Sequence, residues 1–204
     1  MVKGSDVITG SHAKSYDHRQ PLIKFVNNKH IGFLSLKNGD KVLDVGCGTA
    51  EVIRKLYVTH GDTVSFHGID PSDELIKIAR SKFNKNIKNI KLQIGYADQL
   101  PYENNYFDWV ISSLTFHHMS IDTKLSSLRE MYRVLKPSGM LLITDWGKPT
   151  NILASIIVKI WSHHAYVKDN SSGILIELIK KSRFKHIKIL SIQGGFIYHI
   201  LTYK

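Results

Sequence analysis

Residues 41–51 combine a short apolar run with two closely spaced glycines, and this segment limits the possible folds more than any other. Residues 42–45 are mostly valine and leucine, which is typical of a short buried strand. Gly46 and Gly48 follow, where they allow a tight turn and let a ligand approach the backbone closely. Residues 51–57 then have helical spacing. The pattern predicts a strand, a turn and a helix with a ligand held at the turn, although glycines also serve turn geometry alone.

Glu51 bears on which ligand such a turn would hold. A dinucleotide fingerprint has a third glycine three residues after the second, where the pyrophosphate lies against the start of the helix. This chain has Glu51 at that position, and its carboxylate would repel a pyrophosphate. The turn therefore favours a cofactor without phosphate over NAD or FAD.

Length and composition predict a single domain spanning residues 1–204. A chain of 204 residues that is 43% hydrophobic can bury one substantial core. It has no apolar run near the roughly 20 residues that cross a bilayer and no signal-peptide core at its start, so we expect a soluble cytoplasmic protein. Cys47 is the one cysteine, which excludes an internal disulfide and agrees with a reducing compartment.

The formal net charge of +11 has two interpretations. It favours an anionic partner, such as nucleic acid, an acidic lipid surface or an anionic substrate. However, the lysines of residues 77–91 and 180–188 alternate with apolar residues at helical or strand spacing, as on a solvated face. The charge alone does not choose between them.

Strands and helices alternate along most of the chain. Residues 16–36 suggest two short helical pieces that cap the core. The expected strands are 42–45, 64–69, 90–94, 107–114 and 140–144, and the expected helices begin near 51, 72 and 125, the last being ended by the turn 136–139. Two further helices, 152–161 and 174–181, precede strands 187–192 and 196–203, which a glycine turn joins as a hairpin. This order predicts a parallel sheet with helices on both faces and an antiparallel pair at its end.

Five segments carry a resemblance to a known family: VLDVGCGT (42–49), GIDPS (68–72), ADQLPY (97–102), FDWV (107–110) and RVLKPSG (133–139). In this order the chain resembles the class I S-adenosylmethionine-dependent methyltransferases, most closely the small-molecule branch with the ubiquinone and menaquinone C-methyltransferases. The resemblance runs from about Tyr16 to Lys204. It implies a Rossmann-like three-layer α/β/α sandwich with a seven-stranded, mainly parallel sheet and a C-terminal antiparallel hairpin. Residues 1–36 would form a cap or lid, 37–147 the cofactor-binding core, and 148–204 the acceptor-pocket helices and the final hairpin.

The resemblance implies S-adenosyl-L-methionine as the cofactor, held at the carboxyl ends of the strands. The helix start after the glycine turn offers N–H groups to its carboxylate. Asp44 would position its ammonium group, Asp70 its ribose hydroxyls and Asp98 its adenine, although an isolated aspartate is more often a cap or turn residue. The residues predicted to bind the cofactor are Asp44, Gly46, Cys47, Gly48, Asp70, Pro71, Asp98, Gln99, Leu100 and Ser113.

Two residues of the glycine turn need comment. The family usually has glycine at the position of Ala50, and the added methyl group should require only a modest adjustment. Cys47 is common in the family, and we interpret it as a small packed residue rather than a nucleophile.

A sulfonium methyl is already activated, so positioning should dominate catalysis, and a base is needed only where the acceptor loses a proton. The predicted catalytic residues are His117 and His118, after the fourth strand, together with Tyr16; Asp145 is a further candidate base. In the alternative interpretation one histidine packs against the cofactor, the other caps the loop, and Tyr16 belongs to a lid or the core.

The remaining motifs bear on the acceptor. The chain lacks the Asn/Asp-Pro-Pro-aromatic turn and the Pro-Cys nucleophile of nucleic-acid base methylases. His163 and His164 are adjacent and lack accompanying carboxylates, so we expect no metal site. The apolar segment 152–161 is compatible with a pocket wall or a membrane contact, but buried core is the favoured interpretation. The sequence therefore predicts methyl transfer to a small, hydrophobic or quinone-like molecule. The alternatives are an RNA or protein methyltransferase that uses the basic surface, and a non-catalytic regulator that binds S-adenosylmethionine.

Overall fold

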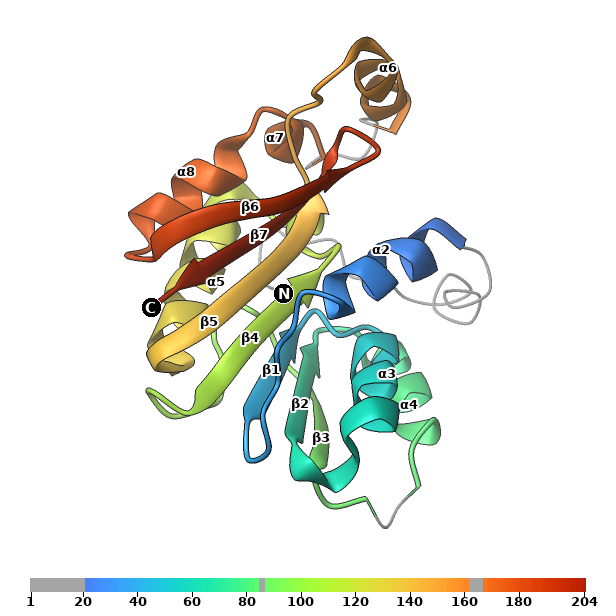
Figure 1. Ribbon diagram of the computed structural model, residues 1–204, viewed down its shortest axis with the longest axis vertical. Coiled ribbons are helices and arrows are strands. Elements are labelled where there is room, and N and C mark those ends of the chain that lie inside the picture. Colours follow the sequence, from blue (N-terminus) through green and yellow to red (C-terminus); the bar gives the residue numbers. More distant parts are fainter. Residues whose placement is uncertain (1–20, 85–86, 162–166) are drawn as a thin grey trace.

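Seven strands form one sheet in the computed structural model, which describes residues 21–84, 87–161 and 167–204 (Figure 1). The strand order is β3-β2-β1-β4-β5-β7-β6. The first five strands are parallel, and β7 runs antiparallel between β5 and β6. This confirms the predicted sheet and its C-terminal hairpin. The strands are β1 Lys41–Val45, β2 Ser65–Asp70, β3 Ile90–Ile94, β4 Phe107–Ser113, β5 Leu135–Trp146, β6 Lys185–Gln193 and β7 Ile197–Tyr203.

Helices cover both faces of the sheet. In the described part of the chain they are α2 Pro21–Ile31, α3 Glu51–His60, α4 Asp73–Ser81, α5 Ile121–Val134, α6 Ile152–Trp161, α7 Val167–Ser171 and α8 Ile174–Lys181, with short 3-10 turns η1 Gly61–Thr63 and η2 Phe116–His118. The helices expected at 152–161 and 174–181 are confirmed, whereas α7 was not anticipated. The described part of the expected N-terminal cap forms one helix, α2, and the rest of that segment, with Tyr16, lies outside the described residues.

The period of two along each strand sends alternate residues into two separate cores. On β1, Val42 packs with α3 and α4, whereas Leu43 packs with α5 and α8. On β5, Leu142 and Leu141 divide between the same two cores. Because both faces of the central strands are covered, these strands are almost continuously apolar, as parallel sheets require.

Strand β5 begins earlier than the sequence suggests. Helix α5 ends at Val134, whereas the sequence predicts that it continues to the turn at 136–139. Leu135 begins β5, and residues 136–139 form an irregular segment inside this strand rather than a separate turn. Phe107 and Trp109 of β4 face Leu135 and Met140 of β5, so a step of five residues on β5 lies opposite a step of two on β4. The irregular segment is equivalent to a β-bulge. Beyond it, β5 pairs with β4 in regular register up to Thr144.

Helix α6 corrects the expectation that residues 152–161 are buried core. Ala154 and Val158 are buried against Trp146 and Phe196, but the opposite face of the helix is open to solvent. The sequence of this helix is apolar on nearly all sides. It therefore does not indicate which face is buried and which is exposed.

Candidate active site

The carboxyl ends of β1, β2, β4 and β5 lie along one edge of the sheet, and the predicted site residues gather there. At β1, Gly46 and Gly48 have φ angles of +74° and +53°, in the left-handed region that favours glycine. A Cβ atom on Gly46 would collide with the side chain of Thr115. The N–H groups of Gly46 and Cys47 both donate to the carbonyl of Ile69, at 2.8 and 3.1 Å. The turn thus needs a glycine at position 46, and it is joined firmly to β2.

Ala50, which stands where the resembling family usually has glycine, also takes a left-handed conformation, with φ of +56°. It precedes helix α3 as the N-cap residue and offers no side-chain cap. The backbone therefore keeps the shape that a glycine would allow, at the cost of a strained alanine. Cys47 in the same turn is buried, and burial, followed by the nearby carboxylates of Asp44 and Asp70, raises the pKa of its thiol. A thiol in that state is a poor nucleophile.

Asp70, at the end of β2, connects the glycine turn to the next helix. Its Oδ2 accepts a hydrogen bond from the N–H of Gly48 at 2.9 Å, and its Oδ1 accepts one from the N–H of Ser72 at 2.9 Å. Burial raises the pKa of Asp70, while these two N–H donors oppose the shift. Each oxygen retains acceptor capacity for a further donor, such as a hydroxyl group.

Asp44 is the most perturbed carboxyl group at this edge. Its side chain is buried, and no hydrogen bond from the described residues reaches its oxygens. Burial first, and the neighbouring Asp70 second, raise the pKa of Asp44 to about 8. A cationic group bound beside it would favour its charged form. The pair of buried carboxyl groups therefore fits a positively charged ligand.

The other predicted cofactor residues lie on two further loops. After β3, Asp98 is half-buried, Gln99 is exposed and Leu100 is buried. The N–H of Leu100 donates to Glu130 Oε2 at 2.9 Å, which ties this loop to α5. Pro71 is half-buried beside Asp70. Each of these residues follows the end of a strand, as the sequence predicts.

Ser113 ends β4 and contacts helix α2. Its hydroxyl donates to Asn27 Oδ1 at 2.7 Å. Asn27 is buried, and no local sequence pattern indicates its contact, because the partner lies 86 positions away. The contact joins the N-terminal helix to the edge of the sheet where the glycine turn lies.

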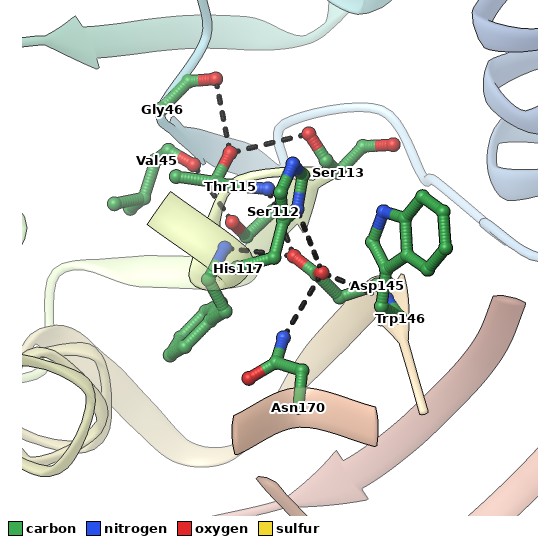
Figure 2. A network of polar contacts seen from close by, with 10 residues as sticks. Val45, Gly46, Ser112, Ser113, Thr115, His117, Asp145, Trp146 and Asn170 are labelled. Carbon is green, nitrogen blue, oxygen red and sulfur yellow. Dashed lines mark hydrogen bonds and ion pairs between the residues drawn. The ribbon is translucent and has the colours of Figure 1, made fainter. Parts of the chain in front are cut away.

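Asp145, near the end of β5, is the centre of a polar network (Figure 2). Its Oδ2 accepts hydrogen bonds from the N–H groups of Thr115 and Phe116, at 2.9 and 2.7 Å. Its Oδ1 accepts from the N–H of Trp146 at 2.7 Å and from Asn170 Nδ2 at 3.1 Å. These donors bind both oxygens of a fully buried carboxylate.

His117 completes this network, with Nδ1 2.9 Å from Asp145 Oδ1. Burial acts against the charged carboxylate, but His117, its hydrogen bond and the backbone donors outweigh it and lower the pKa of Asp145. The charged carboxylate accepts, so the Nδ1 of His117 carries the proton and donates it. The described residues offer no hydrogen bond to Nε2, which leaves this nitrogen as a free acceptor. The two rings of His117 and His118 lie 4.0 Å apart between centroids.

Asn170 of α7 is a site residue that the sequence did not reveal. It stands in a short polar segment without apolar periodicity, and only the fold brings it beneath Asp145 (Figure 2). His163 and His164 lie outside the described residues. Within the ranges that the structure describes, no three histidine, cysteine or acidic residues converge in a way that could hold a metal ion.

The comparisons with known proteins decide the family. A family pattern described as a methyltransferase domain matches residues 42–139. The demethylmenaquinone methyltransferase of Staphylococcus aureus strain Newman is 34% identical over 94% of this chain and 89% of its own length. The chain is a class I S-adenosylmethionine-dependent methyltransferase. It is of the small-molecule type, and S-adenosylmethionine is its cofactor.

Further relatives of this methyltransferase agree with that assignment. The demethylmenaquinone methyltransferase of Staphylococcus saprophyticus is 28% identical over 93% of this chain and 91% of its own. Among solved structures, an S-adenosylmethionine-dependent methyltransferase from Aquifex aeolicus superposes with a TM-score of 0.75, at 24% identity, over 96% of this chain and 98% of its own. At that identity the structural likeness supports the fold alone. Across the described ranges, no helix of the methyltransferase is long and apolar enough to cross a membrane.

Proposed function

We propose that this methyltransferase methylates a ring carbon of a hydroquinone-type molecule and that His117 is its general base. The observation that carries the proposal is the buried pair of Asp145 and His117, because it fixes the tautomer of a histidine at the edge where the cofactor residues gather. Two similar proteins are demethylmenaquinone methyltransferases, which supports the quinone class of acceptor.

The residues proposed to bind the cofactor lie at the same carboxyl edge of the sheet as His117. We propose that Asp44 faces the ammonium group, that the glycine turn with Cys47 lies against the carboxylate, and that Asp70 accepts from the ribose hydroxyls. Pro71, Asp98, Gln99 and Leu100 would enclose the adenine side, and Ser113 the opposite side. When bound, S-adenosylmethionine supplies an activated methyl group. The two buried carboxyl groups support this arrangement, because they fit a ligand of positive charge.

The role of His117 follows from its tautomer. Asp145 holds the proton on Nδ1, so Nε2 is the nitrogen that accepts a proton from the acceptor. A phenolic hydroxyl has a pKa near 10, and its loss of a proton raises the electron density on the neighbouring ring carbon. With the cofactor bound, that carbon would take the methyl group as the bond between the methyl and the sulfonium sulfur breaks, and the neutral thioether S-adenosylhomocysteine would leave. The hydrogen of the ring carbon would then be lost to water as a proton, which restores the aromatic ring. The reduced ring is the acceptor, because an oxidised quinone is poor in electrons.

His118 and Tyr16 have weaker support in this role. The ring of His118 lies against that of His117, with 4.0 Å between the two centroids, and Tyr16 lies outside the described residues. We propose His117 alone as the base and His118 as a packing residue beside it. We also propose that the protein is cytoplasmic and that its partner is a small-molecule acceptor, as the sequence predicts.

The test is the identity of the methylated product. The protein is incubated with S-adenosylmethionine carrying a ¹³C methyl group and, separately, with a tail-free naphthohydroquinone, a phenol, an amine, a thiol and a short RNA. We expect a labelled methyl on a ring carbon of the naphthohydroquinone, identified by NMR and mass spectrometry. Labelling of the amine, thiol or RNA instead, with an unmodified naphthohydroquinone, would contradict the proposal.

A further inference from the structure

Helix α6 presents large apolar side chains to solvent. The exposed fractions of Ile152, Leu153, Ile156 and Ile160 are 82, 68, 52 and 63%. Isolated exposed hydrophobic residues are ordinary on protein surfaces, but four on one ten-residue helix are a continuous stripe. We call these four residues the α6 stripe.

The stripe occupies one side of the helix. At about 100° per residue, its four members fall within an arc of roughly 100°. Ala154 and Val158 lie on the opposite side and pack in a cluster with Trp146 and Phe196. Figure 1 shows α6 standing out from the sheet beside the hairpin of β6 and β7. The helix is therefore anchored by one apolar side and leaves a second apolar side uncovered.

The charge around the stripe is of one sign. Between Asp145 and Asp169 the chain contains no acidic residue, but it contains Lys148, Lys159 and Lys168. Lys148 and Lys168 are exposed, and Lys159 lies on the helix itself. An apolar stripe with flanking lysines is the pattern of a helix that lies in the surface of an anionic membrane.

Helix α6 is anchored close to the candidate active site. Trp146 directly follows Asp145, packs in the cluster that anchors α6, and has its ring 6.2 Å from that of His117. A surface that holds α6 would therefore lie on the same side of the molecule as His117, the proposed base.

We propose that α6 docks this methyltransferase on an anionic lipid surface, with the stripe between the acyl chains and the lysines at the phosphates. The proposal rests on the proposed function in one respect: a hydroquinone with a lipid tail would reach the site from that surface. A second copy of the chain is a poorer occupant, because it would bring the same lysines against each other, whereas lipid phosphates neutralise them.

Vesicle binding tests the stripe directly. Co-sedimentation is measured with vesicles of phosphatidylcholine alone and of phosphatidylcholine with phosphatidylglycerol. The wild type should bind the anionic vesicles, and Ile156→Gln/Ile160→Gln should bind at least roughly 100-fold more weakly. The matched control is Val58→Gln on α3, which alters a side chain that is 75% exposed away from the stripe and should change nothing. Thermal melting confirms that each variant is folded.

A second pair of variants tests the charges. Lys148→Gln/Lys168→Gln should weaken binding to anionic vesicles roughly 30-fold and leave binding to neutral ones unchanged. Lys181→Gln/Arg183→Gln makes the same charge change on α8 and just beyond it, and should have little effect. Equal binding by the stripe variant and the wild type would overturn the proposal, as would a wild-type dimer that the stripe variant loses.

The two proposals fail separately. A wild type that methylates the tail-free naphthohydroquinone but binds no vesicles overturns the docking proposal alone. A wild type that binds anionic vesicles through the stripe but leaves the naphthohydroquinone unmodified overturns the proposed acceptor and supports the docking helix.

Discussion

Replacing Asp44 by asparagine should make the protein more stable at high pH while weakening cofactor binding. Burial and the neighbouring Asp70 raise the pKa of Asp44 to about 8 in the folded protein, against an ordinary value of 3.8. Between these values the folded state holds a proton that the unfolded chain has released, so the free energy of unfolding falls as the pH rises. Asparagine has no proton to lose, and the variant should lack this fall.

The magnitude follows from the pKa. Integrated from pH 6.5 to 8, a group with a folded pKa of about 8 costs the wild type about 1.6 kcal/mol of stability. Urea denaturation of wild type and Asp44→Asn at several pH values in this window measures the difference between the two proteins. Groups that do not interact with Asp44 contribute equally to both proteins and cancel in that difference. It should therefore grow by about 1.6 kcal/mol in favour of the variant.

Cofactor binding provides the second measurement. If the ammonium group of S-adenosylmethionine lies beside Asp44, binding at pH 7 should release about 0.9 proton, the fraction that a pKa of about 8 leaves bound. Calorimetry in two buffers of different ionisation enthalpy measures this release, and Asp44→Asn should show almost none. A stability difference that is constant with pH, together with equal proton release by both proteins, would refute the assignment of Asp44.

Three further predictions concern the stability of the fold. Gly46→Ala should lower the free energy of unfolding by more than about 2 kcal/mol, because φ is +74° and the new Cβ would meet Thr115; denaturation by urea checks this, and an unchanged midpoint would contradict it. Thr144→Val should cost roughly 2–4 kcal/mol, since its hydroxyl lies 2.7 Å from Nδ1 of both His30 and His199, which are buried or nearly so; a loss within 0.5 kcal/mol would count against that network. Burial first lowers the pKa of these histidines to about 3 and about 4, so the unfolded chain takes up protons below pH 6.5 that the folded state refuses, and unfolding monitored by circular dichroism should become easier as the pH falls from 6.5 to 4. The two histidines together outweigh Asp44, which acts in the opposite direction, and a midpoint that rises on acidification would be inconsistent with them.

The positions of the strands along the chain were predictable, because each strand is a short apolar run between glycine, proline or polar residues. Residues 90–94 and 107–113 were found almost to the residue for this reason. The beginning of β5 was not, since Lys136 to Gly139 has turn composition and forms the irregular stretch between Leu135 and Met140, the two residues that pair with β4. Likewise, α6 was expected to be buried, because composition cannot show which face of an apolar helix has a partner.

The candidate site was predictable only in part. The ends of the predicted strands indicated Asp44, Asp70 and His117 as candidates, because ligands bind at the carboxyl edge of a parallel sheet. The contact between His117 and Asp145 depends on the register of β4 with β5, and that of Asn170 on the packing of a five-residue helix. Neither contact can be predicted from the local sequence.

The rate of methyl transfer in His117→Gln tests the central claim most directly. Turnover of the tail-free naphthohydroquinone is measured for wild type, His117→Gln and the neighbouring control His118→Gln, with the affinity for S-adenosylmethionine determined by calorimetry. A base oriented by Asp145 predicts a fall in kcat of about 100-fold to 10,000-fold for His117→Gln, unchanged cofactor affinity, and a nearly wild-type rate for His118→Gln. A wild-type rate in His117→Gln would contradict the claim that this histidine takes the proton of the acceptor.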